Sequence, residues 1–288
     1  MGSVLEIPSQ PETVSNADIA RFAEFFHRQT GIVLPDQRQD LIRRRLERAV
    51  ERHGAKSFRD FLLRLKTDPG GASMQEVINL FTVNETYFYR EAYQFESMVA
   101  HALPEIMTRR RAGLPIKIWC MPCATGEEPF SLAIYLLENW PGIQDIDVEI
   151  MGSDIDTNAL KAARRASYSS RSVSRLPDTA KKKYFNYNNR NETYQLSPDI
   201  VDAVGLSTAN ILDPASIRKF KDVDIIFCRN LLIYFDDAGR KSAVANLYDC
   251  MRPGGYIFLG HSESMSRIST VFEPRRHGDL MLYRRRQE

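Results

Sequence analysis

The sequence predicts an α/β protein in which a doubly wound parallel sheet follows a small helical domain and carries a small β-rich insertion. From about residue 116, apolar runs typical of buried strands alternate with segments of helical spacing, as in a parallel sheet covered by helices. Residues 15–80 show helical spacing only. Residues 166–203 interrupt the alternation, because they are too long for a loop and too polar for a core helix.

These patterns divide the chain of 288 residues into segments. Its apolar content of 43% is enough for one large domain or two modest ones. We expect a flexible N-terminus at 1–14, a helical domain at 15–80, an interdomain linker and helix at 81–115, and the sheet domain at 116–288. The β-rich insertion in that last domain spans about 166–203.

Four helices are expected in the N-terminal domain. The first begins after Ser15, a residue that favours helix N-caps, and ends at Gly31. The second spans about 36–53, the third includes 58–65, and the fourth begins near residue 74.

The sheet domain is expected to alternate strands and helices, with the pair Gly254-Gly255 turning the chain into the fifth strand. The strands are expected at 116–121, 147–152, 204–208, 223–228 and 255–260, with a closing strand near 280–284. The helices are expected at 128–139, 157–165, 213–220 and 237–250.

The net charge of +2 conceals two basic stretches. Residues 161–183 hold eight Lys or Arg and one acid, and residues 37–52 hold six Arg and three acids. Four arginines line one flank of the second helix: Arg44, Arg45, Arg48 and Arg52. Such stretches mark an anionic partner or merely a solvated face, and on charge alone the solvated face is favoured.

Composition argues against several classes of protein. No run of 18 apolar residues predicts a membrane span, and the polar N-terminus lacks the apolar core of a secretory signal, so a cytoplasmic protein is expected. The four cysteines fit that compartment as free thiols. Cys120 and Cys123 form a lone C-x-x-C, which we interpret as small buried residues beside a cofactor loop rather than as a metal or redox site.

Small or polar residues follow three of the apolar runs, within 119–129, 152–156 and 224–230. Open α/β sheets bind ligands outside the carboxyl ends of their strands, so these residues predict a nucleotide-like cofactor lying across the sheet. The phosphate-binding pattern Gly-x-Gly-x-x-Gly fails at 124–126, and no Gly-Lys-Ser/Thr occurs. This favours S-adenosylmethionine, which has no phosphate, over NAD or ATP.

The carboxylates at these strand ends have alternative roles. Asp154 could hold the two ribose hydroxyls or cap the next helix, and we favour the ribose because Asp156 is better placed as the cap. Glu127 and Glu128 open a helix, where they favour the macrodipole. One of them could instead bind the ammonium of a methionine moiety, and the spacing leaves this open.

The polar residues offer further contacts. Asn210 could read an adenine edge, because an amide supplies both a donor and an acceptor. Arg229 and Asn230 favour substrate-side chemistry at the mouth of a buried strand, whereas Tyr234 could face the transferred methyl or simply pack.

Three residues outside the sheet, namely Asn84, Thr86 and Arg90, could close the cofactor pocket as a lid or form a helix cap with solvated neighbours. Gly260-His-Ser-Glu-Ser264 approaches a nucleophile-elbow pattern, but its last position is not glycine, so a serine hydrolase is rejected.

Five segments together carry a resemblance to one family: Asn84-x-Thr86-x-x-x-Arg90-Glu91, Thr125-Gly-Glu-Glu-Pro129, Ser153-Asp-Ile-Asp-Thr157, Phe227-Cys-Arg-Asn-x-x-Ile-Tyr-Phe-Asp236 and Gly260-His-Ser-Glu263. They closely resemble the bacterial chemotaxis-receptor glutamate methyltransferases (CheR), in order and over about residues 15–284. The resemblance implies a helical N-terminal domain, an S-adenosylmethionine-dependent methyltransferase sheet and an inserted β-subdomain.

The same resemblance implies the site. Its cofactor contacts fall on Asn84, Thr86, Arg90, Glu128, Asp154, Asn210, Ile211, Arg229 and Asn230. It thereby favours Glu128 over Glu127. The residues expected to align the substrate carboxylate are Arg90 and Tyr234.

The implied reaction transfers a methyl group from S-adenosylmethionine to glutamate side chains of membrane chemoreceptors and leaves S-adenosylhomocysteine. The expected partner is the cytoplasmic helical region of a receptor, docked on the four arginines of the second helix. Nucleic acid binding and membrane insertion are not expected. The chain is expected to be a monomer. The alternative is a catalytically weak module that senses the cofactor or docks on receptors. Family members that bind a receptor peptide tether carry a glycine-rich loop, but the matching stretch 186–192 has no glycine, so high-affinity tethering is not predicted.

Overall fold

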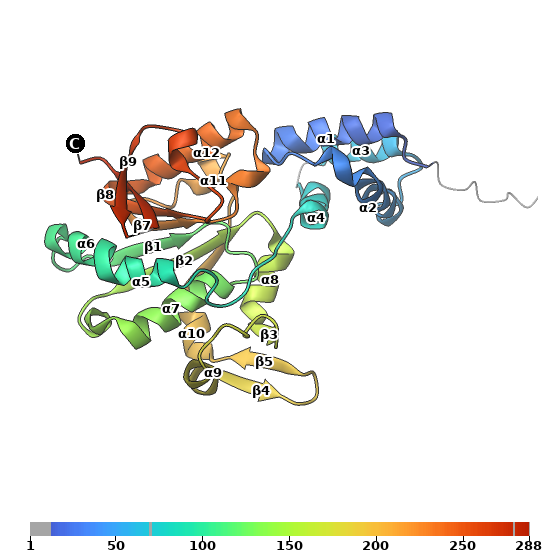
Figure 1. The fold of residues 1–288 in the computed structure, drawn as a ribbon. Helices are drawn as coiled ribbons and strands as arrows, with labels where there is room; N and C mark the ends of the chain where they lie inside the picture. Colours follow the sequence, from blue (N-terminus) through green and yellow to red (C-terminus); the bar gives the residue numbers. More distant parts are fainter. Residues whose placement is uncertain (1–12, 69–70, 279, 288) are drawn as a thin grey trace, which may run out of the picture. The chain divides into compact units, whose positions relative to one another are not determined.

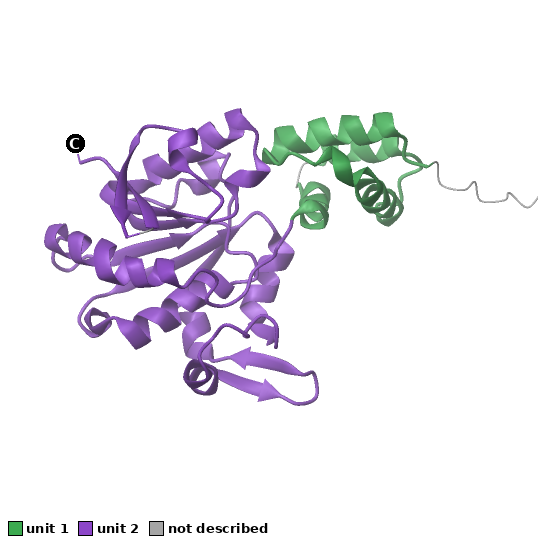
Figure 2. Cartoon of the chain, in the orientation of Figure 1, with its two compact units in different colours: residues 1–82 green, residues 83–288 purple. Residues whose placement is uncertain are grey.

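The computed structural model describes residues 13–68, 71–278 and 280–287, and the chain forms two compact units, 1–82 and 83–288 (Figure 2). The N-terminus expected to be flexible, 1–14, lies outside the described residues except for its last two. Of these, Val14 is buried, and its carbonyl accepts a hydrogen bond from the Arg43 guanidinium.

The first unit is helical, as predicted. Its elements are α1 (Asn16–Thr30), η1 (Asp36–Arg38), α2 (Gln39–Arg52), α3 (Phe58–Thr67) and α4 (Ala72–Phe81). Ser15 and Asp18 form a capping box at the start of α1, and Gly31 ends this helix in the left-handed conformation, with φ of 73°. Phe22, Phe26 and Phe81 pack together and are almost fully buried, so apolar spacing along α1 and α4 builds this core.

The second unit is built on a seven-stranded sheet of order β6-β2-β1-β7-β8-β10-β9 (Figure 1). These strands are β1 (Ile116–Cys120), β2 (Val148–Asp154), β6 (Val204–Thr208), β7 (Val223–Cys228), β8 (Met251–Leu259), β9 (Phe272–His277) and β10 (Leu280–Arg285). The first five pair in parallel, and β10 pairs antiparallel with both of its neighbours, β8 and β9. Strand order reverses between β1 and β7, which is where such sheets bind ligands. The doubly wound sheet is therefore confirmed.

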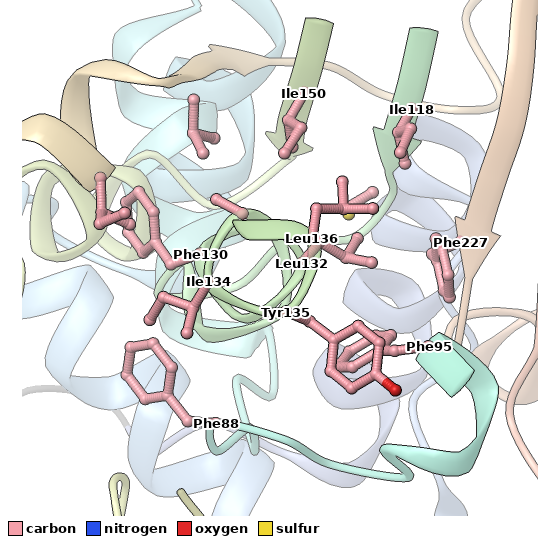
Figure 3. Packing of buried hydrophobic residues seen from close by; sticks show 14 of the residues in the cluster. Phe88, Phe95, Ile118, Phe130, Leu132, Ile134, Tyr135, Leu136, Ile150 and Phe227 are labelled. Carbon is pink, nitrogen blue, oxygen red and sulfur yellow. The ribbon is translucent and has the colours of Figure 1, made fainter. Parts of the chain in front are cut away.

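Helices cover both faces of the sheet, with α7 and α12 on opposite sides (Figure 1). They are α5 (Tyr93–Ser97), η2 (Met98–Ala102), α6 (Leu103–Arg109), α7 (Glu127–Asn139), α8 (Thr157–Arg165), α11 (Pro214–Ile217) and α12 (Asp237–Cys250), with short turns η3 (Pro141–Gln144), η4 (Leu232–Tyr234) and η5 (Met265–Arg267). Side chains alternate along β1: Ile118 packs in the core around α7 (Figure 3), whereas Trp119 stacks on Phe220 at 4.1 Å between ring centroids.

Residues 83–115 belong to the second unit, although the sequence interpretation treated 81–115 as an interdomain linker and helix. Phe88 and Phe95 are fully buried in the core of this unit (Figure 3). The Phe88 ring makes edge contacts with Tyr168 and Phe185, so the segment before β1 is anchored by aromatic packing.

The insertion forms a separate antiparallel sheet of order β3-β5-β4. It consists of β3 (Ser167–Ser169), α9 (Asp178–Tyr184), β4 (Phe185–Asn188), β5 (Thr193–Leu196) and α10 (Pro198–Asp202). The small β-subdomain is thus confirmed, and the stretch 186–192 lies at its β4–β5 hairpin.

Two details of the large sheet differ from the sequence expectation. Strand β8 begins at residue 251, so the glycine pair at 254–255 lies within the strand and not before it. A Cβ on Gly255 would lie 2.8 Å from the Asp224 carbonyl oxygen, so this glycine lets the neighbouring strand approach closely. Strand β9 was not predicted at all.

No described helix is both long and apolar enough to cross a membrane.

Candidate active site

Several of the predicted site residues lie at or just after the carboxyl ends of β1, β2, β6 and β7: Glu128, Asp154, Asn210, Ile211, Arg229 and Asn230. The chain leaves these strands at Cys120, Asp154, Thr208 and Cys228. Backbone hydrogen bonds join the ends: Cys123 donates to the Ser153 carbonyl at 2.9 Å, and Ala209 donates to that of Asp154 at 3.0 Å. Parallel pairing therefore brings residues far apart in sequence to one edge of the sheet.

Asp154 lies at the end of β2 with 3% of its surface exposed. Its Oδ2 accepts from the Ala124 backbone N–H at 2.8 Å, and its Oδ1 accepts from that of Asp156 at 2.8 Å. Burial raises the pKa of this carboxyl to about 6, against the lowering effect of the two N–H donors. The Ile155 backbone N–H also interacts with this carboxylate, so Asp154 ties the loop after β1 to the loop after β2.

Asp156 caps α8, as expected, because its Oδ1 accepts from the backbone N–H groups of Asn158 and Ala159 at 2.8 and 3.0 Å. Its Oδ2 accepts from Asn84 Nδ2 at 2.7 Å. The predicted lid residue Asn84 is thereby connected to the end of β2, within the second unit.

Glu127 and Glu128 point to different partners. Glu127 is buried, and its two oxygens accept from the Ser172 hydroxyl at 2.8 Å and the Thr125 hydroxyl at 2.5 Å. Glu128 Oε2 accepts from Arg229 Nη1 at 2.8 Å. Its buried Oε1 has no nitrogen or oxygen donor among the described residues, and the Cys120 thiol lies beside the carboxylate group. An orphaned carboxylate oxygen at the strand-order reversal fits the ammonium of S-adenosylmethionine.

Arg229 is held by acidic and carbonyl oxygens, and only 2% of its side chain is exposed. Besides Glu128, its Nη2 lies 3.2 Å from Glu91 Oε2 and 2.7 Å from the Arg90 carbonyl oxygen. Burial raises the pKa of Glu128, and the charge of Arg229 opposes this shift. The guanidinium therefore links the segment before β1 to the start of α7.

The two expected aligning residues lie on different segments. Arg90 is half-buried; its Nη1 donates to the Glu85 carbonyl at 2.8 Å, and its guanidinium lies 5.8 Å from the centre of the Tyr87 ring. Tyr234 is half-buried in η4, directly after the loop that carries Asn230. Thr86 is half-buried on the same segment as Arg90.

Asn210 and Ile211 follow β6. The Asn210 Oδ1 accepts from the Leu212 backbone N–H at 3.0 Å, which shapes this turn. Ile211 is 2% exposed, and its carbonyl accepts from Asn246 Nδ2 at 2.7 Å. The turn presents the backbone of these residues at the edge of the sheet.

Two acidic residues carry more of this geometry than the sequence interpretation assigned to them. Glu91 pairs with Arg229, and its Oε1 lies 3.1 Å from His261 Nδ1. Glu263 accepts from the backbone N–H groups of Asn230, Leu232 and Gly260. Both stand in the segments that carry the family resemblance, which was the available signal.

The cysteines of the C-x-x-C pair are buried beside this site. Burial raises the pKa values of Cys120 and Cys123 well above that of an ordinary thiol, so both thiols are protonated at neutral pH. Such thiols are poor nucleophiles and poor metal ligands.

The arginines of the expected docking edge lie on α2, in the first unit. Arg44, Arg48 and Arg52 are exposed, whereas Arg45 is half-buried with its guanidinium 5.9 Å from the centre of the Phe81 ring. The edge thus presents three solvated charges and one charge that rests on an aromatic ring.

Comparison with known proteins agrees with this geometry. Residues 17–82 match the model of the CheR methyltransferase all-alpha domain, and residues 84–278 match that of the CheR methyltransferase SAM binding domain. The chain is 44% identical over 263 residues to chemotaxis protein methyltransferase 2 of Vibrio cholerae serotype O1, a match that covers 91% of each chain.

Two further relatives come from Pseudomonas. Chemotaxis protein methyltransferase 1 of Pseudomonas aeruginosa is 31% identical, over 94% of this chain and 99% of its own. Chemotaxis protein methyltransferase Cher2 of Pseudomonas putida is 30% identical, over 91% of this chain and 95% of its own. With both of its domains matched by the family models and with relatives at 30–44% identity over most of its length, this chain belongs to the CheR family of S-adenosylmethionine-dependent methyltransferases.

Proposed function

We propose that this protein transfers a methyl group from S-adenosylmethionine to glutamate side chains of membrane chemoreceptors, at their cytoplasmic helical region. Family membership and the printed names of the relatives support this activity. The structural observation that carries it is a pair of carboxylates at the carboxyl ends of neighbouring strands: Glu128 at the start of α7, which follows β1, and the buried Asp154 at the end of β2.

The residues present fit the cofactor. We assign the ammonium to Glu128 Oε1, which has no hydrogen-bond partner among the described residues, and the ribose hydroxyls to the Asp154 carboxylate at the end of β2. The proposed cofactor-binding residues are Asn84, Thr86, Arg90, Glu128, Asp154, Asn210, Ile211, Arg229 and Asn230. When bound, S-adenosylmethionine supplies a methyl group on a sulfonium sulfur and leaves as S-adenosylhomocysteine.

The chain has little proton chemistry to perform. A glutamate with a pKa of about 4.3 is already ionised at pH 7, so its oxygen is a nucleophile without a general base. The protein must align the carboxylate and exclude water, and such positioning contributes up to about 7–11 kcal/mol in well-oriented systems. We assign the alignment to Arg90, whose charge attracts the carboxylate, and to Tyr234, whose hydroxyl can donate to it.

Substrate docking is proposed to use the basic edge of α2. Receptor methylation regions are acidic because glutamates are the substrates, and Arg44, Arg48 and Arg52 are exposed on that helix. Exposed ion pairs are individually weak and are screened by salt, so several must act together.

Calorimetry with labelled-methyl transfer tests the proposal. The protein should bind S-adenosylmethionine and bind neither NAD nor ATP, and it should transfer the labelled methyl to a receptor cytoplasmic fragment. Replacing the acceptor glutamates by alanine in that fragment should abolish the label. Cofactor binding without transfer to any receptor fragment would instead favour a sensing or docking module.

A further inference from the structure

We propose that Glu263 is a positioning residue for methyl transfer: its carboxylate clamps the loop 229–234, which carries three of the proposed site residues, into its working conformation. This inference rests on the proposed function. Glu263 lies after β8, whereas the loop follows β7, so the contact joins segments more than 30 residues apart in sequence.

The clamp consists of hydrogen bonds from the backbone to both carboxylate oxygens. Glu263 Oε2 accepts from the N–H of Asn230 at 2.7 Å and from that of Gly260 at 2.9 Å. Its Oε1 accepts from the N–H of Leu232 at 2.8 Å. Hydrogen bonds to an ionised acceptor are about twice as strong as those between neutral groups, so one side chain fixes two points of the loop.

The loop has a conformation that needs such support. Asn230 has φ of 57°, in the left-handed region that residues with a side chain rarely adopt. The backbone at Gly260 must also approach closely, because a Cβ there would lie 2.9 Å from Asn230 Nδ2 and 2.9 Å from Glu263 Oε2. Glycine at position 260 therefore leaves the space that the Glu263 carboxylate occupies.

The clamp has different consequences for the residues of the loop. Arg229 is independently held by Glu128, by Glu91 and by the Arg90 carbonyl. Asn230 is joined to the clamp directly, and Tyr234 follows two residues after Leu232 in the same turn. Among the several proposed cofactor contacts the clamp holds only Asn230 directly, whereas Tyr234 is one of just two proposed aligning residues. Loss of the clamp should therefore disturb the alignment of the substrate carboxylate more than the anchoring of the cofactor.

The test is Glu263→Gln in the full chain. Glutamine keeps the size of the side chain and one acceptor oxygen, but its NH₂ group is a donor and cannot accept from the backbone N–H groups that the second carboxylate oxygen binds. Glu273→Gln is the matched control. That glutamate accepts from Arg284 at 2.8 Å and from Arg275 at 3.0 Å, on strands β9 and β10 of the same sheet. Both variants lose a charged acceptor, and only the first lies at the loop.

Four quantities should be measured: turnover at saturating substrates, cofactor affinity by calorimetry, the melting temperature, and hydrogen–deuterium exchange of peptides that cover 229–235. We expect Glu263→Gln to lower turnover at least about tenfold, by more than it weakens cofactor binding, since small misplacements of reacting groups are costly. Exchange should rise in 229–235 alone. Glu273→Gln should match the wild type in turnover and in loop exchange.

Two results would overturn the assignment. One is wild-type turnover with unchanged exchange of the loop. The other is an equal loss of turnover and cofactor affinity with faster exchange throughout the sheet, which indicates a general structural role. If Glu263→Gln does not fold, Glu263→Asp serves instead, because it keeps the charge but shortens the side chain and should give the same local pattern. Exchange and calorimetry need no methyl acceptor, so failure of the wild type to methylate receptors would contradict the proposed function separately.

Discussion

Replacing Asp154 should separate its contribution to the fold from its contribution to cofactor binding. The change to alanine leaves the buried backbone N–H groups of Ala124 and Asp156 without their acceptor. An unsatisfied buried donor costs about 1–3 kcal/mol, so the free energy of unfolding should fall by about 2–6 kcal/mol. The change to asparagine keeps one acceptor oxygen and should cost about 1–3 kcal/mol.

Replacing Asp154 should weaken cofactor binding by more than the loss of folding stability alone would cause. A hydrogen bond to a charged group contributes about 1.5–3 kcal/mol, so loss of the carboxylate should weaken S-adenosylmethionine at least about tenfold. Asp224→Asn is the matched control. Asp224 is also 3% exposed and accepts from the Lys117 backbone N–H at 3.0 Å. It lies near the start of β7, however, and not at the carboxyl end of a strand, where Asp154 lies. Its replacement should lower stability and leave cofactor affinity unchanged.

The raised pKa of Asp154 predicts the direction in which stability and cofactor affinity change with pH. Because the folded-state pKa of Asp154 is raised from 3.8 to about 6, the folded protein holds this proton more tightly than the unfolded chain. The part of the stability that comes from this tighter proton binding is therefore largest below pH 4 and is lost as the pH rises through 6, whereas the hydrogen bonds to the two N–H groups remain. Cofactor affinity should change oppositely, weakening below pH 6 as the carboxylate is protonated.

The assays are calorimetry and chemical denaturation of Asp154→Asn, Asp224→Asn and the wild type between pH 5 and pH 8, a range that spans the raised pKa of about 6. Unchanged cofactor affinity in folded Asp154→Asn would refute the ribose role. Equal loss of affinity in Asp224→Asn would show that the effect is general destabilisation.

Three further predictions concern alignment, the ammonium site and docking. Arg90→Ala should lower turnover more than cofactor affinity, since it removes the charge proposed to orient the carboxylate; steady-state kinetics with wild-type turnover at saturating cofactor would remove Arg90 from the mechanism. Glu128→Gln should weaken S-adenosylmethionine at least about tenfold in calorimetry, whereas Glu127→Gln should not, because the Glu127 oxygens already accept two hydroxyls. Reversing Arg45 and Arg48 to Glu should raise the apparent KM for receptor several-fold with cofactor affinity unchanged, and wild-type methylation should fall as salt rises. Normal methylation by the double reversal at low ionic strength would place docking elsewhere, with the basic stretch 161–183 as the next candidate.

Much of the sheet was predictable because its central strands are buried on both faces and read as apolar runs. Strand β9 escaped prediction since it is an edge strand that contains Pro274 and the charged pair Arg275-Arg276. The sequence predicts an interdomain linker and helix at 81–115. It does not show that residues from 83 on belong to the second unit, because the burial of Phe88 and Phe95 depends on partners far along the chain.

The sequence indicated candidate site residues but not the contacts among them. Position at the strand ends and before the sheet indicated most of the candidates, and the family resemblance added Ile211 and favoured Glu128 over Glu127. Sequence could not show that backbone N–H groups occupy Asp154, or that Glu263 reaches across to Asn230. These contacts depend on loops from different strands that meet only in the folded protein.

Transfer of a tritiated methyl group from S-adenosylmethionine into membranes that contain chemoreceptors tests the central claim most directly. The account predicts label in a receptor band that is released as methanol by mild base, because a glutamyl methyl ester hydrolyses readily. It also predicts less label with Asp154→Asn when the cofactor is not saturating. Label absent from every receptor, or resistant to base, would contradict it.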